Sequence, residues 1–334
     1  MKVLLRADAG IIQGTGHIMR CLTLAEALST RGHEAELAWA GTDVPWLAQH
    51  VHDSGIRVHE SMPDVLDKAL IEMSAPDWVV VDSYRIPAEE ISAANELTPV
   101  LAIVDGDDRG IEATLYLDHN LGARAETYRH PARVLAGADY ALVRDEVLQQ
   151  RRPEPWSMSG PRPTIVSFMG GTDPTAASIP VVRALIAASA STRIIVVAPQ
   201  QLHKDLETIL ANREHSELLS PTPALPELFG LADLVVSAAG TSAWDVCALA
   251  IPAVLVGVVD NQSASITSVV ETGVALAIAV SKDTNNLVTD LTPLVTTLLT
   301  DQDARVRLSQ TCRRVFDGEG KSRVVKRMEE AVSG

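Results

Sequence analysis

A histidine stands near the start of the chain, at the point where a short apolar segment gives way to a helical pattern. Val3-Leu4-Leu5 predicts a strand, Gly14-Thr15-Gly16 follows, and His17 begins the helix. The carboxyl ends of parallel strands border the ligand crevice of open α/β sheets, and a histidine can exchange a proton near neutral pH. His17 is therefore a candidate catalytic base, although a histidine in a tight turn at a helix start can also be purely structural.

The glycines of this segment narrow the range of ligands. Gly14-Thr15-Gly16 lacks the third glycine of the dinucleotide-binding fingerprint, and no P-loop lysine follows it. The sequence therefore predicts neither a dinucleotide site nor a P-loop here. The glycines still allow the backbone to approach a ligand closely.

Polar residues follow three other apolar stretches of the first half. These stretches are Val81-Asp82-Ser83-Tyr84, Ile103-Val104 with Asp105, Asp107 and Asp108, and Leu117-Asp118-His119-Asn120. Side chains at the carboxyl ends of parallel strands point into the crevice. The three carboxylates at 105–108 are compatible with a divalent metal site, but acidic residues are also common in turns and at helix N-caps, and we expect turn chemistry there.

Two glycine-containing junctions in the second half are candidate phosphate sites. A strand ending at Phe168-Met169 leads into Gly170, Gly171, Thr172 and Asp173, and a strand ending at Ser237 leads into Gly240, Thr241 and Ser242, with Asp245 one turn later. Free N–H groups at a helix start attract phosphate, and Asp245 can accept a hydrogen bond from a ribose hydroxyl. A turn capped by Thr172 or Asp173, and close helix packing around Gly240, are the structural alternatives.

Short apolar runs alternate with helix-length segments along the chain, which predicts an α/β fold with parallel sheets. A proline-rich stretch at 151–163 suits a linker, so we expect an N-terminal domain at 1–150 and a C-terminal domain at 164–334. The charged helical segment at about 302–332 can pack on either domain. The expected strands are 3–5, 35–40, 79–81, 100–104, 115–117, 164–168, 193–197, 234–237 and 253–256, with helices in the first half at about 16–31, 43–54, 62–73 and 87–96.

Composition excludes several classes of partner. The 334-residue chain has a net charge of −15 and no long basic run, so we expect no nucleic-acid partner. It shows no signal-peptide pattern and no apolar stretch of about 18 residues, so we expect no membrane partner and a cytoplasmic location. Three widely separated cysteines, Cys21, Cys247 and Cys312, predict neither disulfides nor a zinc site but buried apolar side chains.

Seven short motifs, in order along nearly the whole chain, carry a resemblance. They are Arg6-Ala7-Asp8, Gly14-Thr15-Gly16-His17 with Met19-Arg20-Cys21-Leu22, Val81-Asp82-Ser83-Tyr84, Leu117-Asp118-His119-Asn120, Tyr140-Ala141-Leu142-Val143-Arg144, the segment from Ser167 to Pro174, and Asp260-Asn261-Gln262. Together they resemble the UDP-sugar hydrolases of pseudaminic acid biosynthesis, which act on UDP-2,4-diacetamido-2,4,6-trideoxy-β-L-altropyranose. The chain is more distantly similar to lipid-II-forming N-acetylglucosaminyltransferases, which share a two-domain GT-B fold.

The resemblance implies that the first domain holds the sugar and the second holds UDP. His17 is then the base that activates water, and Tyr84 positions the sugar or the water. The implied substrate-binding residues are Arg6, Asp8, Gly14, Thr15, Gly16, Arg20, Asp82, Asn120, Asn261 and Gln262, and the implied nucleotide-binding residues are Gly170, Gly171, Thr172, Asp173, Gly240, Thr241, Ser242 and Asp245. The chain departs from the family pattern at Asp245, where the family has glutamate, at His119, and at Met169 before the glycine pair.

The expected reaction is inverting hydrolysis at the anomeric carbon without a metal or another cofactor. Diphosphate is a good leaving group, and helix N-termini can stabilise its charge. A glycosyltransferase with a soluble acceptor also fits the sequence, because no basic patch with interleaved aromatic residues suggests a lipid acceptor and aromatic residues make up only 4% of the chain. The same residues are compatible with a metal-dependent hydrolase that uses Asp105 to Asp108, or with a non-catalytic nucleotide-sugar binding protein.

Overall fold

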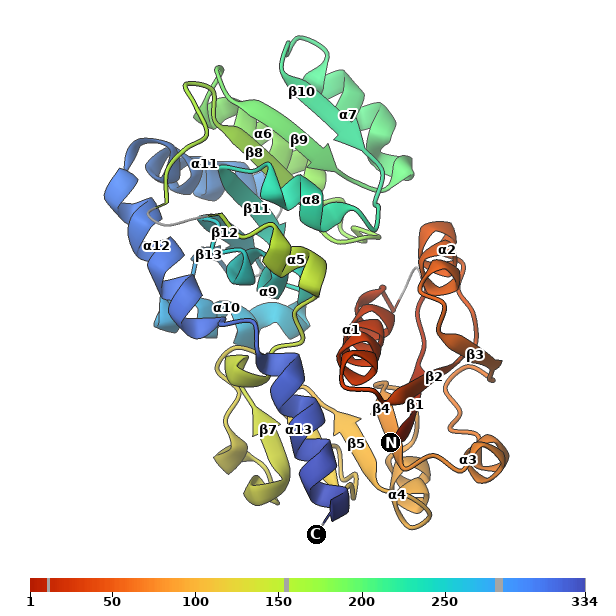
Figure 1. Cartoon of the computed structure of the whole chain (residues 1–334). Coiled ribbons are helices and arrows are strands. Elements are labelled where there is room, and N and C mark those ends of the chain that lie inside the picture. Colours follow the sequence, from red (N-terminus) through yellow and green to blue (C-terminus); the bar gives the residue numbers. More distant parts are fainter. Residues whose placement is uncertain (11–12, 153–155, 280–284, 334) are drawn as a thin grey trace. The chain divides into compact units, whose positions relative to one another are not determined.

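The computed structural model describes residues 1–10, 13–152, 156–279 and 285–333, without the side chains of Thr241, Asn261, Asn285 and Ser333. The chain forms two compact units (Figure 1). Unit 1 consists of Met1–Leu142 together with the C-terminal segment from Gly318, and unit 2 of Val143–Asp317. Both units are parallel sheets with crossover helices, so the predicted α/β class is confirmed.

Unit 1 is a doubly wound sheet whose strands lie in the order β3-β2-β1-β4-β5-β6-β7 among the described residues, all parallel. Three short 3₁₀ turns, at Ala125–Thr127, Pro131–Arg133 and Ala138–Tyr140, surround β7. The strands are β1 Lys2–Ala7, β2 Glu34–Trp39, β3 Arg57–Glu60, β4 Trp78–Asp82, β5 Val100–Ile103, β6 Leu115–Asp118 and β7 Val134–Ala136, and the helices are α1 Gly16–Thr30, α2 Pro45–Asp53, α3 Lys68–Ser74, α4 Ala88–Asn95 and α13 Gly320–Ser333.

Both faces of this sheet are buried, which explains why its inner strands read as continuous apolar runs. Alternate side chains of β1 point to opposite faces: Leu5 joins a core with α1, α2 and α13, whereas Leu4 joins a second core with α3 and α4. The same alternation separates Val80 from Val79 on β4. The sheet is thus fixed from both sides, and the loops after its strands gather along one edge.

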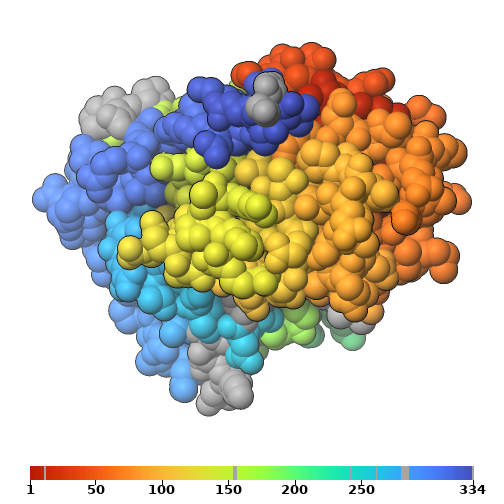
Figure 2. Space-filling view, turned by 90° about the horizontal axis from the view of Figure 1, so that it is seen from below, coloured from red at the N-terminus to blue at the C-terminus, as the bar shows by residue number. Residues whose placement is uncertain are grey.

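The C-terminal helix α13 belongs to unit 1, which corrects the expected C-terminal domain of 164–334. Val324, Val325 and Met328 are fully buried in the core that α1 also lines. Gly320 starts the helix against the backbone of Ala141, where a Cβ has no room. Ion pairs join α13 to the N-terminal part of the chain, and Figure 2 shows its dark blue surface beside the red surface of that part. The unit boundary on the N-terminal side falls between residues 142 and 143 rather than at 151–163.

Unit 2 repeats the arrangement with strands in the order β10-β9-β8-β11-β12-β13 among the described residues, again all parallel. Its main core lies between this sheet and the helices α6, α7 and α11. The strands are β8 Thr164–Phe168, β9 Arg193–Val197, β10 Ser216–Leu219, β11 Leu234–Ala238, β12 Ala253–Val256 and β13 Leu276–Ile278, the helices are α5 Asp145–Gln149, α6 Ser178–Ala188, α7 His203–Leu210, α8 Leu225–Gly230, α9 Thr241–Ala248, α10 Ser263–Thr272, α11 Asn285–Thr300 and α12 Gln302–Val315, and 3₁₀ turns span Gln200–Leu202 and Asp260–Gln262.

The proline-rich segment predicted as a linker is part of unit 2 where the structure describes it. Trp156 is buried, and Ser159 donates from both its N–H and its hydroxyl to Asp233. Arg152 pairs with the same carboxylate and lies over the Trp156 ring. The segment is therefore packed against unit 2. The three cysteines are free and buried, as predicted. Within the described ranges, no helix combines the length and apolarity needed to cross a bilayer.

Candidate functional site

The predicted motifs gather where each sheet reverses its strand order. In unit 1 the chain runs outward from β1 to β3 and then returns to β4 beside β1, and in unit 2 it runs from β8 to β10 and returns to β11 beside β8. Ligands of doubly wound sheets bind beyond the carboxyl ends of the strands at such a reversal. His17 lies at the start of α1, which follows β1, and Asp82 ends β4. The segments after β8 and β11 hold the two glycine junctions.

Asp82, the last residue of β4, orients His17 and Arg20 on the first turns of α1. Asp82 Oδ1 lies 2.6 Å from His17 Nδ1, and Arg20 donates to both carboxylate oxygens, at 2.7 Å to Oδ1 and 2.8 Å to Oδ2. His17 Nδ1 has two neighbours, Asp82 Oδ1 at 2.6 Å and Arg20 Nη2 at 2.9 Å. Because Asp82 is ionised and is the closer of the two, we assign the His17 proton to Nδ1, where it donates to Asp82. His17 Nε2 then carries the free lone pair that a general base needs.

The electrostatics of this cluster follow from its burial. Burial alone raises the pKa of Asp82, but the charge of Arg20, the charge that His17 carries when it is protonated, and the hydrogen bonds of both outweigh it and hold that pKa well below its usual range. Burial and the charge of Arg20 lower the pKa of His119 to about 3. His119 Nε2 lies 3.4 Å from Arg20 Nη1, so a neutral imidazole backs the guanidinium. His17 thus sits beside one fixed anion and one fixed cation.

Tyr84, predicted to position the sugar or the water, borders the His17 imidazole. The two ring centroids are 4.8 Å apart at an interplanar angle of 78°, an edge-on contact. Tyr84 is half exposed, whereas His17 is buried. The loop that carries Tyr84 is also bound by Arg109, which the sequence did not indicate: Arg109 donates to the carbonyl oxygens of Ser83 and Tyr84.

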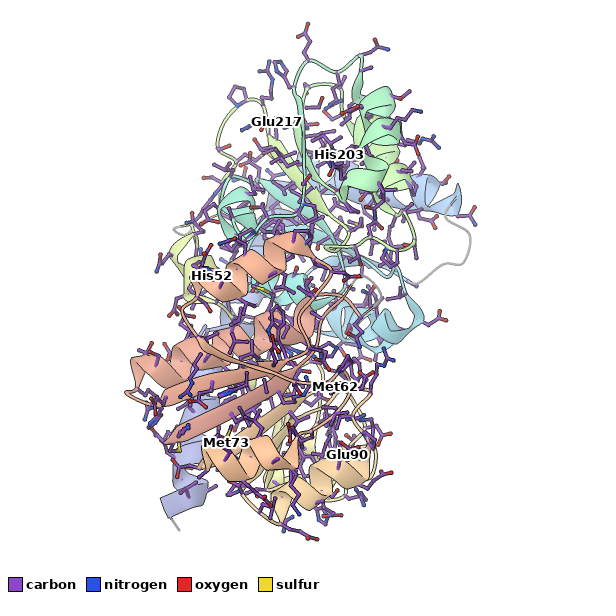
Figure 3. All side chains as sticks on the ribbon, turned by 90° about the vertical axis from the view of Figure 1, so that its right-hand side faces the viewer. His52, Met62, Met73, Glu90, His203 and Glu217 are labelled. Atoms are coloured by element: carbon purple, nitrogen blue, oxygen red, sulfur yellow. The ribbon has the colours of Figure 1, made fainter. Side chains whose placement is uncertain are left out.

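Arg6 and Asp8 form a buried ion pair, which differs from the expectation that they contact substrate. Arg6 Nη1 and Nη2 each donate to a different oxygen of Asp8 at 2.7 Å, and Nε and Nη2 also donate to the carbonyl oxygens of Val65 and Met62. Asp8 further accepts from the backbone N–H of Asp64. The guanidinium and carboxylate are thus used to hold the loop at 61–66, whose Met62 side chain is exposed (Figure 3).

The glycines before α1 are joined through their backbones. Gly10 and Gly14 exchange backbone hydrogen bonds in both directions, and Gly14 has a φ of +80°, which favours glycine. Thr15 stands at the N-cap of α1 but makes no side-chain capping bond. The N–H groups that begin at Gly16 are therefore not capped by this side chain, which leaves the positive end of a 15-residue helix beside His17.

Two of the three carboxylates at 105–108, Asp107 and Asp108, make turn contacts as expected, whereas Asp105 binds Asn120 of another loop. Asp107 accepts from the N–H of Arg109, and Asp108 accepts from Gly110 and pairs with Arg129. No cluster of three or more His, Cys, Asp or Glu side chains in the described part of the chain is arranged to hold a metal ion. Asn120, predicted to contact substrate, donates through its amide nitrogen to Asp105 and Asp118 and so joins the loops after β5 and β6.

Asp173, predicted to bind nucleotide, instead caps α6. Its carboxylate accepts from the N–H groups of Ala177 and Ser178 at 2.9 Å each, and the side chain is buried. Burial raises the pKa of Asp173. The first-turn amides of α6 that a phosphate would need are thus already occupied. Gly170, with φ +101°, and the following Gly171 and Thr172 are only partly buried, so their backbone remains accessible in this turn.

At the other glycine junction, Asp245 is paired with an arginine. Arg144 Nη2 donates to Asp245 Oδ2 at 2.6 Å, and both side chains are about one-eighth exposed. Arg144 is the last residue of a motif that carries the resemblance, but the resemblance implies no role for it. Gln262 lies over Gly240, whose Cβ would come 3.5 Å from Gln262 Nε2, and its Oε1 accepts from Val258. The side chains of Thr241 and Asn261 lie outside the described part of the structure.

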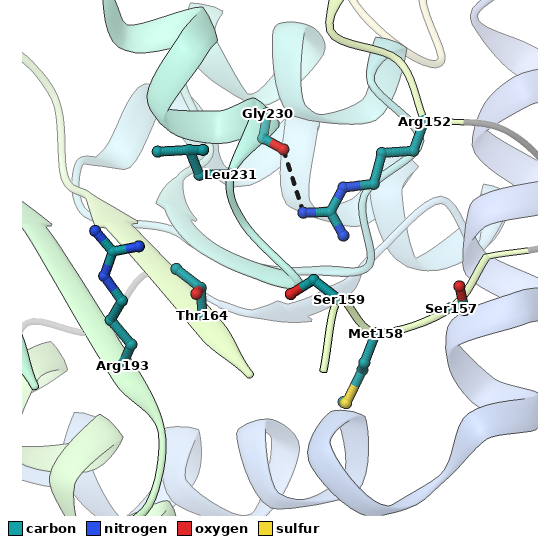
Figure 4. Close-up of a pocket in the computed structure, with 8 residues that line it drawn as sticks. All are labelled: Arg152, Ser157, Met158, Ser159, Thr164, Arg193, Gly230 and Leu231. Carbon is teal, nitrogen blue, oxygen red and sulfur yellow. Dashed lines mark hydrogen bonds between the residues drawn. The ribbon is translucent and has the colours of Figure 1, made fainter. Parts of the chain in front are cut away.

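A separate pocket opens at the amino ends of the unit 2 strands, where Arg193 begins β9 (Figure 4). Both arginines that line it are already paired: Arg152 donates to the carbonyl oxygen of Gly230 and pairs with Asp233, and Arg193 pairs with Glu217. We therefore assign no ligand to this pocket.

Comparison with known proteins establishes the fold. No family model matches the chain. The spore coat polysaccharide biosynthesis protein SpsG of Bacillus subtilis (strain 168) is 22% identical over 357 residues, covering 99% of this chain and 98% of its own. A solved glycosyltransferase of kitacinnamycin matches with TM-score 0.68 at 17% identity over 99% and 98% of the two chains, and S. aureus MnaA in its UDP co-structure matches with TM-score 0.68 at 13% identity over 97% and 94%.

The chain has the GT-B fold. Each of its two units is a doubly wound parallel sheet, as the resemblance implied. At identities this low, the structural similarity establishes the fold but does not identify the substrate.

Proposed function

We propose that this protein is a nucleotide-sugar hydrolase. It cleaves the anomeric C–O bond of a UDP-linked 2,4-diacetamido-2,4,6-trideoxyhexose with inversion and releases the free sugar and UDP for nonulosonic acid biosynthesis. The water oxygen attacks C1, its proton passes to His17 Nε2, and the bonding pair leaves with the diphosphate oxygen. No metal or other cofactor takes part in this proposal.

The geometry of His17 is the observation that carries the proposal. Its Nδ1 lies 2.6 Å from Asp82 Oδ1, which orients the ring and favours the tautomer with a free Nε2, and Tyr84 packs edge-on against it. An imidazole held in this way is suited to general-base catalysis on water. Substrate contacts in unit 1 are proposed for Gly14, Thr15, Gly16 and Asn120, whereas Arg20 and Asp82 act on His17, and Arg6 and Asp8 act on the loop at 61–66.

Unit 2 is proposed to bind the nucleotide diphosphate. The backbone N–H groups of Gly170, Gly171 and Thr172 and those at the start of α9 can stabilise the charge that develops on the leaving group. Asp245 keeps a ribose contact in this proposal with Arg144 as its support, and Asn261 and Gln262 contribute from the segment after β12. Asp173 is left out because its carboxylate caps α6.

Two findings support a nucleotide-sugar substrate. The relative that spans the whole chain is named for polysaccharide biosynthesis, and the solved structures with this fold include one bound to UDP. A glycosyltransferase is the second candidate, because the kitacinnamycin protein with the same fold is a glycosyltransferase. The two candidates differ only in the nucleophile that attacks C1.

The test is a proton-NMR time course with UDP-2,4-diacetamido-2,4,6-trideoxy-β-L-altropyranose in ¹⁸O-water without added metal, followed by mass analysis of the products. Labelled sugar with unlabelled UDP supports the proposal. Label in UDP means attack at phosphorus and contradicts it. Turnover that needs an added sugar or amine acceptor favours the transferase.

A pair of variants ties the reaction to His17. His17→Asn should reduce kcat by about 10²–10⁴-fold with KM little changed, since a positioned base contributes that much. His130→Asn is the matched control, because His130 is exposed and its nearest partner is Glu112. Equal turnover by both variants would remove His17 from the mechanism.

A further inference from the structure

The position of the Tyr84 ring depends on how the backbone of the loop after β4 is held. Its side chain is half exposed, yet its ring makes a defined edge-on contact with His17. The turn that follows is fixed by Ser83, whose hydroxyl oxygen accepts from the N–H groups of Arg85 and Ile86. These bonds hold the downstream N–H groups and leave the carbonyl oxygens of Ser83 and Tyr84 to other partners.

Arg109 supplies donors to both of these carbonyl oxygens. Its Nη1 lies 2.8 Å from the oxygen of Tyr84, and its Nη2 lies 2.7 Å from the oxygen of Ser83. A single planar guanidinium therefore bridges two successive peptide groups, an arrangement that lysine cannot reproduce. Hydrogen bonds from a charged donor are stronger than neutral ones, so the bridge restrains the backbone on which Tyr84 is mounted.

The loop after β5 is shaped to present this arginine. Arg109 has a φ of 53°, a left-handed conformation that is uncommon for a side chain of this size, and its N–H donates to Asp107 Oδ1 at 3.0 Å. Burial lowers the pKa of Arg109, while the charges of Asp107 and Asp105 oppose that effect. The strained turn and its carboxylates thus hold a charged guanidinium against the loop after β4.

We propose that Arg109 is a positioning residue, which holds the Ser83–Tyr84 segment so that the Tyr84 ring stays against His17. Its effect on turnover rests on the proposed function, but its effect on the ring contact does not. Loss of the bridge should leave unit 1 folded and release Tyr84. Because a displacement of about 1 Å in a positioning group can lower the rate by about 10²-fold, we expect a kcat loss of about 10- to 100-fold.

The first experiment observes the ring contact without turnover. In protein with ¹³C,¹⁵N-labelled histidine, the His17 ring protons feel the Tyr84 ring current and are assigned with His17→Asn and Tyr84→Leu. Arg109→Ala should move these signals toward their Tyr84→Leu positions, and Arg109→Lys should move them only part of the way. Arg129→Ala is the control, since Arg129 binds Asp108 of the same loop and neither carbonyl oxygen.

Wild-type His17 shifts in Arg109→Ala and in Arg109→Gln, with a folded circular-dichroism spectrum, would overturn the inference. The Gln variant guards against a misfolded Ala variant. The second experiment compares kcat in the Arg109→Ala, Tyr84→Ala and double variants on the nucleotide sugar. The double variant should be no slower than Tyr84→Ala, whereas independent losses that multiply would contradict action through Tyr84. A wild-type protein that turns over no nucleotide sugar refutes the proposed function and leaves the NMR result to decide the role of Arg109.

Discussion

At the scale of single residues, the candidate base depends on a buried chain of charges. Asp82 holds His17 and Arg20 together, and His119 stands behind Arg20 as a neutral ring. Removing one partner of a buried charge pair leaves the other without compensation, which typically costs about 3–5 kcal/mol. The network therefore orients His17 and at the same time makes the stability of unit 1 sensitive to acid.

His119 gives a test of that sensitivity. Its pKa is about 3 in the folded chain and near 6.5 in the unfolded chain, so between these values only the unfolded state binds a proton. The stability that neutral His119 contributes is fully present above pH 6.5 and is lost as pH falls toward 3. We expect His119→Gln to lower the slope of unfolding free energy against pH by about 1.4 kcal/mol per pH unit in that window.

The measurement is urea unfolding followed by circular dichroism at pH 7.5, 6.0 and 5.0. The exposed His130→Gln variant is the control for loss of an imidazole as such. Equal slopes for His119→Gln and the wild type would show that His119 does not carry the effect.

At the scale of elements, the site is shaped by loops that side chains tie to the sheet. Arg6 and Asp8 fasten the loop at 61–66 to the end of β1, and Asn120 joins the loops after β5 and β6. Burial by itself raises the pKa of Asp8. Hydrogen bonds from Arg6 and from two backbone N–H groups, together with the charge of Arg6, outweigh burial, so the pKa lies below its usual value and Asp8 stays ionised. Each loop thus owes its position to a charged or amide side chain.

The Asp8 contacts predict a local effect on amide exchange. Asp8→Asn loses the charge and one acceptor oxygen, so the N–H groups of Asp64 and Ala40, which donate to Asp8, should exchange about 10- to 100-fold faster. Amide hydrogen exchange by NMR measures this at each position. Asp77→Asn is the control, because that exposed carboxylate accepts the backbone N–H of Lys2, far from the loop. Unchanged protection at Asp64 would contradict the anchoring role of Asp8.

At the scale of the whole molecule, the segment from Gly318 onward packs in unit 1 after the chain has formed unit 2. Residues 143–317 form unit 2, and α13 then completes the core of unit 1 beside α1. The core that unit 1 forms between its sheet and α1 is therefore incomplete until α13 has been synthesised, whereas the core with α3 and α4 contains no residue of α13. The folding of unit 1 depends on contacts between segments about 300 residues apart, which close slowly.

This dependence predicts that a mutation near the C-terminus destabilises the N-terminal unit. Val325→Ala removes two buried methyl groups from the unit 1 core and should lower its stability by about 2 kcal/mol. Val295→Ala, equally buried on α11, is the matched change in unit 2. Hydrogen exchange of β1 and β8 amides reports the two units separately. Faster exchange of β8 rather than β1 in Val325→Ala would contradict the assignment of α13.

The sequence by itself determined the inner strands and the segments that carry candidate functional residues. Four expected strands lie within observed inner strands: 3–5 in β1, 79–81 in β4, 164–168 in β8 and 234–237 in β11. They could be predicted because strands buried on both faces read as continuous apolar runs. The missed strands, β3, β7, β10 and β13, stand at the edges of the two sheets. An edge strand has one neighbour, and β3 is mostly exposed, so its residues show no such run.

Only the tertiary structure decided which polar groups remain for a ligand. His17 was recognisable from its place after a strand and two glycines, and Asp173 was recognisable as a candidate cap, since the N–H groups it binds lie only four and five residues further on. The partners of Arg6 and Asp8 in the loop at 61–66 lie 56 to 59 residues away, and no local pattern links them. Arg109 carries no local signal at all, since its acceptors lie 25 and 26 residues away. Side-chain type and spacing mark where a ligand can bind, whereas the burial of long-range hydrogen bonds determines which of those side chains the protein has already used.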